Sequence, residues 1–153
     1  AVPMELIRDL VNDSILAPSA GNEQPWEFVV VTDAEVIDRL AKAKPHGASF
    51  LKHAPLAVVV CADTQKSDVW VEDAAIASLI LHLAATDLGL GSCWVQIRLR
   101  EHDADRSAQE YVAELLGLGK TLAVLSMVAI GYPVEKKSGH PASPLLFEKV
   151  RNL

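Results

Sequence analysis

Hydrophobic residues recur along the chain with two spacings, which separate predicted helices from predicted strands. From Leu6 to Leu16 they follow the helical period, and Pro18 ends that pattern. Short runs of β-branched and aromatic residues are instead typical of strands. The pattern predicts helices over residues 4–17, 32–44, 71–88 and 105–116 and strands over residues 26–32, 56–62, 92–97 and 121–132. Thr32 and Glu35 have the spacing of a capping box, so we expect Thr32 to begin the second helix.

Two of these segments indicate how the layers are arranged. Residues 56–62 are continuously apolar, which favours a central strand buried on both faces. Residues 71–88 are apolar nearly all round and end at Gly89, so we expect them to form the most buried helix. The alternating order fits a doubly wound sheet, and it fits equally well another sheet wrapped by helices on both faces. Residues 133–153 have no core-forming pattern, and we expect this tail to lie on another surface.

Composition and charge narrow the class of protein. The 153 residues are 50% hydrophobic, and we interpret residues 1–153 as a single domain. A net charge of −6 argues against nucleic acid or an anionic membrane as partner. No segment has the length of a membrane span or the pattern of a signal peptide. We interpret Cys61 and Cys93 as reduced, buried thiols, which predicts a cytoplasmic protein.

Several short motifs imitate known sites but have the wrong context. The glycines of residues 88–94 run from a helix into a strand, the reverse of a dinucleotide-binding turn. Residues 117–121 resemble the end of a phosphate-binding loop, yet they also precede a strand. His102, Asp103 and Asp105 lack the spacing of a metal site, and no serine or cysteine has a base placed to activate it. We therefore predict no metal and no catalytic side chain.

The turn between the first helix and the first strand has an unusual composition. Its core, Ser19 to Asn22, offers amide and hydroxyl groups and no charge. Such a turn suits a neutral, polar, planar ligand.

Three segments together resemble the FMN-dependent nitroreductase family. These are Ala17-Pro18-Ser19-Ala20-Gly21-Asn22-Glu23-Gln24-Pro25-Trp26, then Gly89-Leu90-Gly91-Ser92-Cys93-Trp94, and finally Ile130-Gly131-Tyr132-Pro133 followed by Glu135. The resemblance covers nearly the whole chain. It implies an α+β fold, a three-layer sandwich whose mixed, mostly antiparallel sheet is flanked by helices, and a homodimer.

The resemblance also implies which residues bind FMN. The turn of one subunit would reach the flavin held mainly by the other, and the strand at residues 93–96 would run under the isoalloxazine ring with its backbone N–H groups toward N5 and O4. Trp26 is expected to pack in the core because it begins a buried strand, and ligand contact is the alternative. The implied cofactor-binding residues are Pro18, Ser19, Ala20, Asn22, Gln24, Cys93, Trp94, Val95, Gln96, Lys136 and Lys137.

The resemblance departs at the start of the chain. Family members carry an early R-R-S-x-R-type motif that holds the FMN phosphate, whereas this sequence begins with Ala1-Val2-Pro3 and matches only after that point. Lys136 and Lys137 remain as basic phosphate contacts. Either the sequence is a piece of a longer protein, which we favour because every later motif is intact, or the protein is a flavin-poor relative. In both cases we expect this chain to bind FMN weakly or not at all.

The implied function is an FMN-dependent NAD(P)H oxidoreductase. It would reduce nitro compounds, quinones or similar small-molecule acceptors by ping-pong transfer through flavin N5. The alternative is a non-catalytic or degenerate flavin-binding dimeric scaffold.

Overall fold

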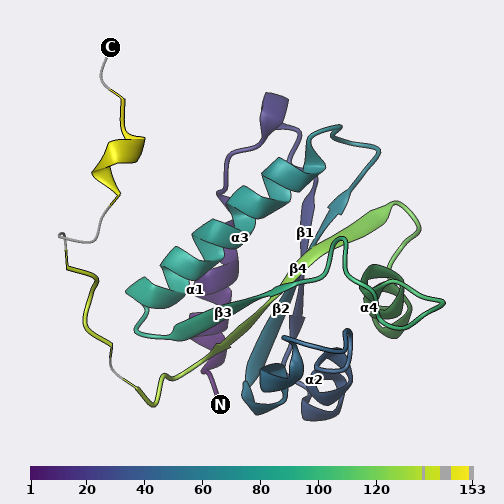
Figure 1. Cartoon of the computed structure of the whole chain (residues 1–153), viewed down its shortest axis with the longest axis horizontal. Coiled ribbons are helices and arrows are strands. Elements are labelled where there is room, and N and C mark those ends of the chain that lie inside the picture. Colours follow the sequence, from purple (N-terminus) through teal and green to yellow (C-terminus); the bar gives the residue numbers. More distant parts are fainter. Residues whose placement is uncertain (136, 142–145, 152–153) are drawn as a thin grey trace.

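Helices and strands alternate along the chain, as the hydrophobic pattern predicts (Figure 1). The computed structural model describes residues 1–135, 137–141 and 146–151. Within them the helices are α1 (Met4–Ile15), α2 (Ala34–Leu40), α3 (Trp70–Asp87) and α4 (Ala108–Leu116), the strands are β1 (Trp26–Val31), β2 (Leu56–Asp63), β3 (Gly91–Gln96) and β4 (Leu122–Gly131), and the short 3-10 helices are η1 (Ala20–Asn22), η2 (Ser49–His53) and η3 (Phe147–Lys149).

The four strands form one sheet in the order β1-β2-β4-β3. All three pairings are antiparallel, so the described sheet contains no parallel neighbours and is simpler than the mixed sheet expected. β1 and β3 are the two edges. This arrangement rules out the doubly wound parallel alternative.

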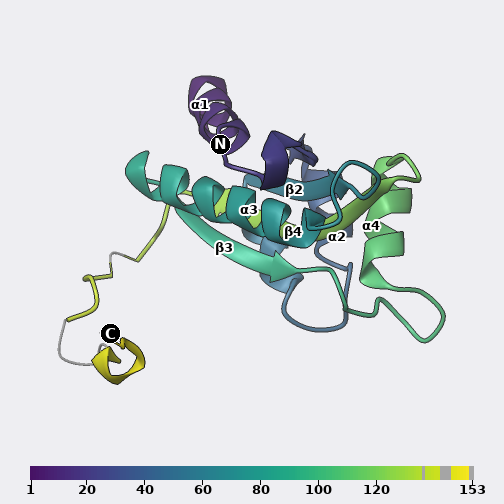
Figure 2. The ribbon, with the colours of Figure 1, turned by 90° about the horizontal axis from the view of Figure 1, so that it is seen from above.

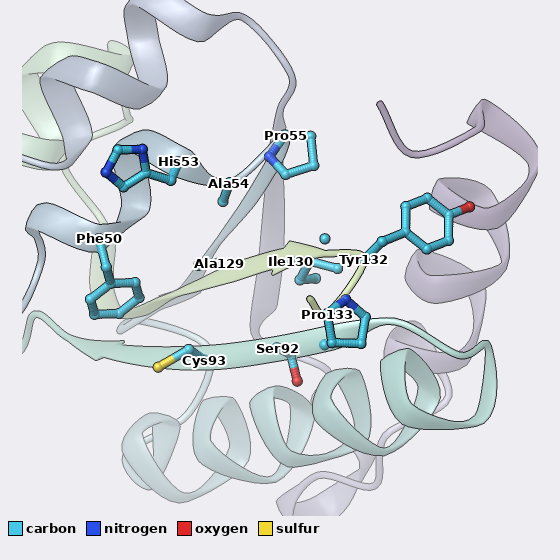
Figure 3. A pocket seen from close by; sticks show the side chains of 12 residues that line it. Phe50, His53, Ala54, Pro55, Ser92, Cys93, Ala129, Ile130, Tyr132 and Pro133 are labelled. Atoms are coloured by element: carbon cyan, nitrogen blue, oxygen red, sulfur yellow. The ribbon is translucent and has the colours of Figure 1, made fainter. Parts of the chain in front are cut away.

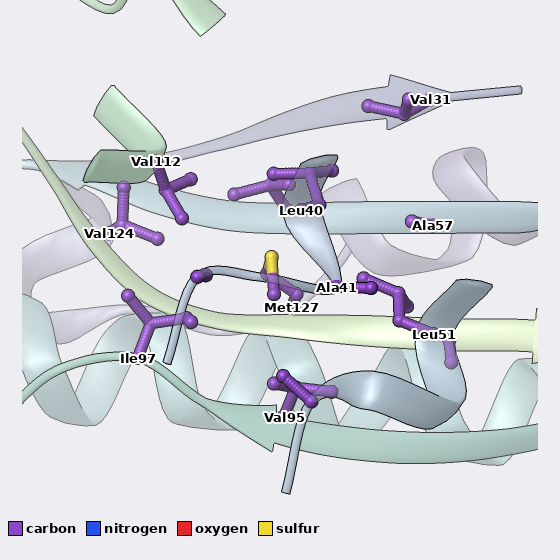
Figure 4. Close-up of a cluster of buried hydrophobic side chains, with 14 of the residues drawn as sticks. Val31, Leu40, Ala41, Leu51, Ala57, Val95, Ile97, Val112, Val124 and Met127 are labelled. Atoms are coloured by element: carbon purple, nitrogen blue, oxygen red, sulfur yellow. The ribbon is translucent and has the colours of Figure 1, made fainter. Parts of the chain in front are cut away.

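Helices cover both faces of the sheet and make three layers. Alternate residues of β2 serve the two cores: Val58 and Val60 pack with α1 and α3, and Val59 and Cys61 pack with α2, η2 and α4. Figure 4 shows the second of these cores, with Leu40, Val112 and Met127 converging between the sheet and its helices. The predicted α+β three-layer sandwich and the doubly buried central strand are confirmed.

Two helices begin later than the sequence pattern indicates. Asp33, not Thr32, caps α2, because its carboxylate accepts hydrogen bonds from the N–H groups of Glu35 and Val36. α2 also ends at Leu40, short of the expected residue 44. α4 begins after Ser107, which forms a capping box with Glu110.

α3 is the most buried of the described helices, as predicted, with seven buried residues, but one face of it is open. Its inner face packs on the sheet, but Ile76, Leu79 and Leu83 on its outer face are 39%, 55% and 58% exposed. A single chain therefore covers only one side of this apolar helix. Gly89 follows α3 in the left-handed conformation (φ 72°), as predicted for the residue after a helix.

The tail beyond Gly131 leaves the body of the protein, and η3 lies apart from the sheet and its helices (Figures 1 and 2). Among the described residues no helix is both long and apolar enough to cross a membrane.

Candidate functional site

The neutral turn between α1 and β1 is a tightly wound loop with much of its surface exposed. Gly21, Asn22 and Gln24 have positive φ angles of 56°, 57° and 49°. Asparagine and glycine adopt this left-handed conformation more readily than other residues. The Gln24 N–H donates to Ser19 Oγ at 2.9 Å, so the backbone of Gln24 helps to hold the turn while its side chain stays exposed. Pro18, Ala20 and Asn22 are exposed, and Ser19 is half-buried.

The turn is fastened to α3 through a buried carboxylate. The Ala20 N–H donates to Asp73 Oδ1 at 2.8 Å, and the Ser67 hydroxyl donates to Asp73 Oδ2 at 2.8 Å. Reasoning from the sequence did not give Asp73 a role in the site. The available signal was an acidic residue in the first turn of an otherwise apolar helix.

Trp26 follows the turn at the start of β1 and is 8% exposed, packed with Ala17 and Ala77. Its predicted core role is confirmed.

β3 presents different side chains to the two faces of the sheet. Val95 packs with the α2 and η2 core, and Cys93 lies on the same face. Trp94 lies toward α3, where its Nε1–H donates to Gln96 Oε1 at 2.9 Å. The Gln96 Nε2–H in turn donates to the Arg98 carbonyl at 2.8 Å. These bonds fix the Trp94 and Gln96 side chains against the strand.

The outer edge of β3 carries backbone groups that no strand pairs. The Ile97 N–H donates to the Leu125 carbonyl at 3.2 Å, and the register continues as Val95 opposite Met127. In an antiparallel pair the hydrogen-bonded positions alternate, so the N–H groups of Trp94 and Gln96 point away from β4. Since β3 is an edge strand of the described sheet, these donors are available to a ligand.

A histidine on α3 supports the start of β3. His82 Nδ1 lies 2.7 Å from Ser92 Oγ, and its ring stacks with that of Trp94 at 6.2 Å between centroids. Burial lowers the pKa of His82 below its ordinary value of 6.5. His82 thus has a structural role, with its ring nitrogen and its ring face both in contact with β3.

A hollow of about 280 Å³ lies beside β3 on the η2 face (Figure 3). Phe50 and His53 stand on one side, and Tyr132 and Pro133 stand at its other end. Gly131 forms part of the lining and has no room for a side chain, because an added Cβ would lie 2.8 Å from Pro55 Cδ. This close approach explains the glycine of the Gly131-Tyr132-Pro133 segment.

The two cysteines differ, contrary to the prediction that both are buried. Cys61 is fully buried in β2, and burial together with the Glu27 charge raises the pKa of its thiol to about 12. Cys93 is exposed, because β3 is an edge strand of the described sheet. The apolar sequence around Cys93 indicated a strand but not its place at the edge.

Of the two basic residues predicted for the phosphate, one lies exposed in the tail and the other lies outside the described residues. Lys137 is 78% exposed in the tail, with Nζ 3.6 Å from Glu135 Oε2. Lys136 lies outside the described residues.

No group of three or more metal-binding side chains gathers in the described part of the chain. His102, whose spacing from Asp103 and Asp105 does not suit a metal, has a structural role. Its Nδ1 lies 3.1 Å from the Ala43 carbonyl oxygen, and its ring stacks on that of Tyr111.

A single chain does not bring the two halves of the predicted site together. The turn of residues 18–24 leads into β1, at one edge of the sheet, and residues 93–96 form β3, at the other edge. α3 touches both halves, through Asp73 and through His82.

The sheet order, the two helix layers and these motifs define an α+β three-layer protein of a recognisable class. A sequence profile of the nitroreductase family matches residues 1–48 and 42–132. The chain belongs to the nitroreductase family.

Individual relatives agree with this assignment. An Archaeoglobus fulgidus protein provisionally named an NADH dehydrogenase/NAD(P)H nitroreductase is 39% identical over 142 residues, covering 90% of this chain and 78% of that protein. An NADH dehydrogenase of Thermus thermophilus is 29% identical over 188 residues, covering 97% of this chain and 85% of that protein. Among solved structures, an FMN-dependent nitroreductase from Clostridium difficile has a TM-score of 0.96 at 40% identity, covering 99% of this chain and 88% of that chain.

Proposed function

We propose that two copies of this chain bind FMN between them and use it to reduce small-molecule acceptors with NAD(P)H. The family and the names of its relatives support the general class, an NAD(P)H-dependent flavin oxidoreductase. The observation that carries the proposal is the placement of two complementary half-sites at opposite edges of one sheet.

The chemistry of the donor set fits a flavin ring. The outward N–H groups of Trp94 and Gln96 are neutral donors in a row, suited to the acceptor atoms along one edge of an isoalloxazine. Asn22 adds an exposed amide on the turn, which both donates and accepts. The core of the turn, Ser19 to Asn22, and residues 93–96 of β3 carry no charge and no nucleophile paired with a base, which suits a site where the cofactor performs the chemistry.

Each half has a distinct task in this proposal. β3, through Cys93 to Gln96, supports the ring and directs its backbone donors to it. Pro18, Ser19, Ala20, Asn22 and Gln24 of the other copy close the site and exclude water. The chemistry that bound FMN supplies is transfer of reducing equivalents from NADH or NADPH to a nitro compound, a quinone or a similar acceptor in a ping-pong cycle.

The outer face of α3 supports the homodimer. Ile76, Leu79 and Leu83 form an exposed apolar stripe on the helix that joins the two half-sites. Covering such a stripe with a second copy removes apolar surface from water and unites opposite edges of two sheets. Lys136 and Lys137 remain the proposed contacts for the FMN phosphate, and Glu135 competes for Lys137.

The test is an anaerobic titration. With enough FMN present to load this weakly binding chain, the flavin is expected to be bleached by NADH or NADPH only when the protein is present, and to regain its colour with a nitroaromatic or a quinone. Initial rates with both substrates varied are expected to give parallel double-reciprocal lines. Protein that binds FMN but never bleaches supports the dimeric scaffold instead, and protein that binds no flavin contradicts both functions.

A further inference from the structure

Asp73 is a buried carboxylate whose oxygens are both engaged by neutral donors. It is 2% exposed, and the ion pairs of the described residues include no partner for it. Burying a carboxylate without a cation is costly unless fixed hydrogen bonds replace water. Here the Ala20 N–H and the Ser67 hydroxyl, each at 2.8 Å, replace it. The position of Asp73 in the first turn of α3 adds the favourable field of the helix N-terminus.

Among the described hydrogen bonds, the bond to Ala20 is the one that joins residues 18–24 to another element. The other described hydrogen bonds of residues 18–24 stay inside the turn: Asn22 N–H to the Ser19 carbonyl, Glu23 N–H to the Ala20 carbonyl and Gln24 N–H to Ser19 Oγ. Three left-handed residues make this turn dependent on such support. Ala17 and Trp26 place the two ends of the turn against Ala77 of α3, and the Asp73 bond fixes its middle.

We propose that Asp73 is a positioning residue of the flavin site, acting through the Ala20 backbone, with Ser67 orienting its carboxylate. This inference rests on the proposed function, because it assumes that the turn contacts the flavin. α3 then fixes one half-site by Asp73 and faces the second copy with its apolar stripe, so the carboxylate determines how the turn is presented to the neighbouring site.

The role requires an acceptor at Oδ1 more than a charge. In Asp73→Asn the amide oxygen can still accept from the Ala20 N–H, and the amide N–H can donate to the Ser67 oxygen. Asp73→Ala leaves the Ala20 N–H without its partner and frees the turn. Glu72→Ala is the matched control, because it removes an exposed carboxylate from the same turn of α3.

The experiment measures FMN and riboflavin affinities of the dimer by fluorescence quenching, together with melting temperature and kcat and KM. We expect Asp73→Ala to weaken both ligands by the same factor, about ten- to a hundredfold. Asp73→Asn is expected to stay within about threefold of the natural protein, and Glu72→Ala to be unchanged. Because riboflavin has no phosphate, an equal loss of affinity for both ligands would show that the turn contacts the ring and the ribityl chain and not the phosphate.

Three outcomes distinguish a failure of the proposed function from a failure of the role proposed for Asp73. If the natural protein binds neither flavin, the proposed function fails, and this inference fails with it. If the natural protein binds but Asp73→Ala keeps full affinity, only the role of Asp73 is wrong. If Asp73→Asn loses as much affinity as Asp73→Ala at an unchanged melting temperature, the charge matters rather than the acceptor, which overturns the positioning role.

Discussion

Individual residues of this protein show which atoms are left for a ligand after the fold has used the others. In the turn, Ser19 Oγ and the Ala20 N–H are already occupied, whereas the Asn22 side chain has no partner among the described hydrogen bonds. On β3 the side chains of Trp94 and Gln96 bond to one another, and their backbone N–H groups stay available. A ligand at this site therefore meets mostly backbone and amide donors.

The two thiols provide a residue-scale prediction. Thiolate is the reactive form, so Cys61, with its pKa raised to about 12, is expected to be inert, and exposed Cys93 is expected to react. A disulfide reagent is expected to label one thiol in native protein prepared without FMN and two in denaturant. Saturating FMN is expected to slow the labelling of Cys93 at least severalfold.

Cys61 is the internal control, because its labelling reports any unfolding. Rapid native labelling in a Cys93→Ser variant would show that the buried strand opens. If saturating FMN left the labelling rate of Cys93 unchanged, β3 would not be part of the flavin site.

His82 provides a prediction about pH. Its pKa is lowered in the folded protein, so the unfolded chain binds a proton first as pH falls below about 6.5. The free energy of unfolding is therefore fully retained above that pH and decreases below it, toward the lowered folded pKa. His82→Asn keeps a polar atom near Ser92 and removes the titration.

Urea denaturation at pH 7.5 and pH 5.5 measures this effect. The stability difference between the natural protein and His82→Asn is expected to be smaller at pH 5.5. A difference that grows at pH 5.5 would contradict a lowered pKa.

At the scale of elements, β3 owes its proposed role to its place at the edge of the sheet. Proline is tolerated in edge strands where its missing N–H would face outward. Gln96→Pro removes one outward donor and the Gln96 side chain, whereas Gln96→Ala removes only the side chain. We expect Gln96→Pro to bind FMN at least about tenfold more weakly than Gln96→Ala, because a donor in a desolvated site is lost.

Circular dichroism and melting temperature provide the check that both Gln96 variants fold. Equal FMN affinities for the two folded variants would show that the outward N–H of Gln96 does not touch the flavin.

Hydrophobic periodicity predicted the helices and strands well, and the burial of their side chains and their capping residues less well. The continuous run of β2 identified a central strand, because both of its faces must be apolar. The exposure of Ile76 and Leu79 on α3 did not follow from their apolarity, since apolar residues on an exposed helix face have the same sequence pattern as residues buried in the chain's own core. Asp33 replaced Thr32 as the cap because neighbouring residues compete for the same N–H groups. The motifs identified the turn and β3, but Asp73 needed the fold, since 53 residues separate it from Ala20.

At the scale of the whole molecule, the proposed flavin site depends on how two copies of the chain share its halves. β1 and β3 are opposite edges of one sheet, so the turn and the β3 strand of a single chain are separated by two strands. An exposed apolar stripe on α3 lies on the helix that contacts both. Two copies joined through this helix would complete two sites, each with the turn of one copy and β3 of the other.

Mixed dimers test this sharing most directly. Asn22→Gly removes the amide from the turn while keeping its left-handed backbone (φ 57°), and Gln96→Pro removes the donor from β3. In a dimer of one chain of each kind, one shared site carries both defects and the other carries none. The two chains, distinguished by different affinity tags, are refolded together, and the doubly tagged dimer is isolated.

FMN is then added at a concentration that fills the natural dimer but neither variant homodimer, and bound FMN is counted per dimer. Each mixed dimer is expected to bind one FMN with the affinity of the natural dimer and to have half the activity of the natural dimer. Mixed dimers that bind no more FMN than the variant homodimers would show that each site is built within one chain, and the shared flavin site would be wrong.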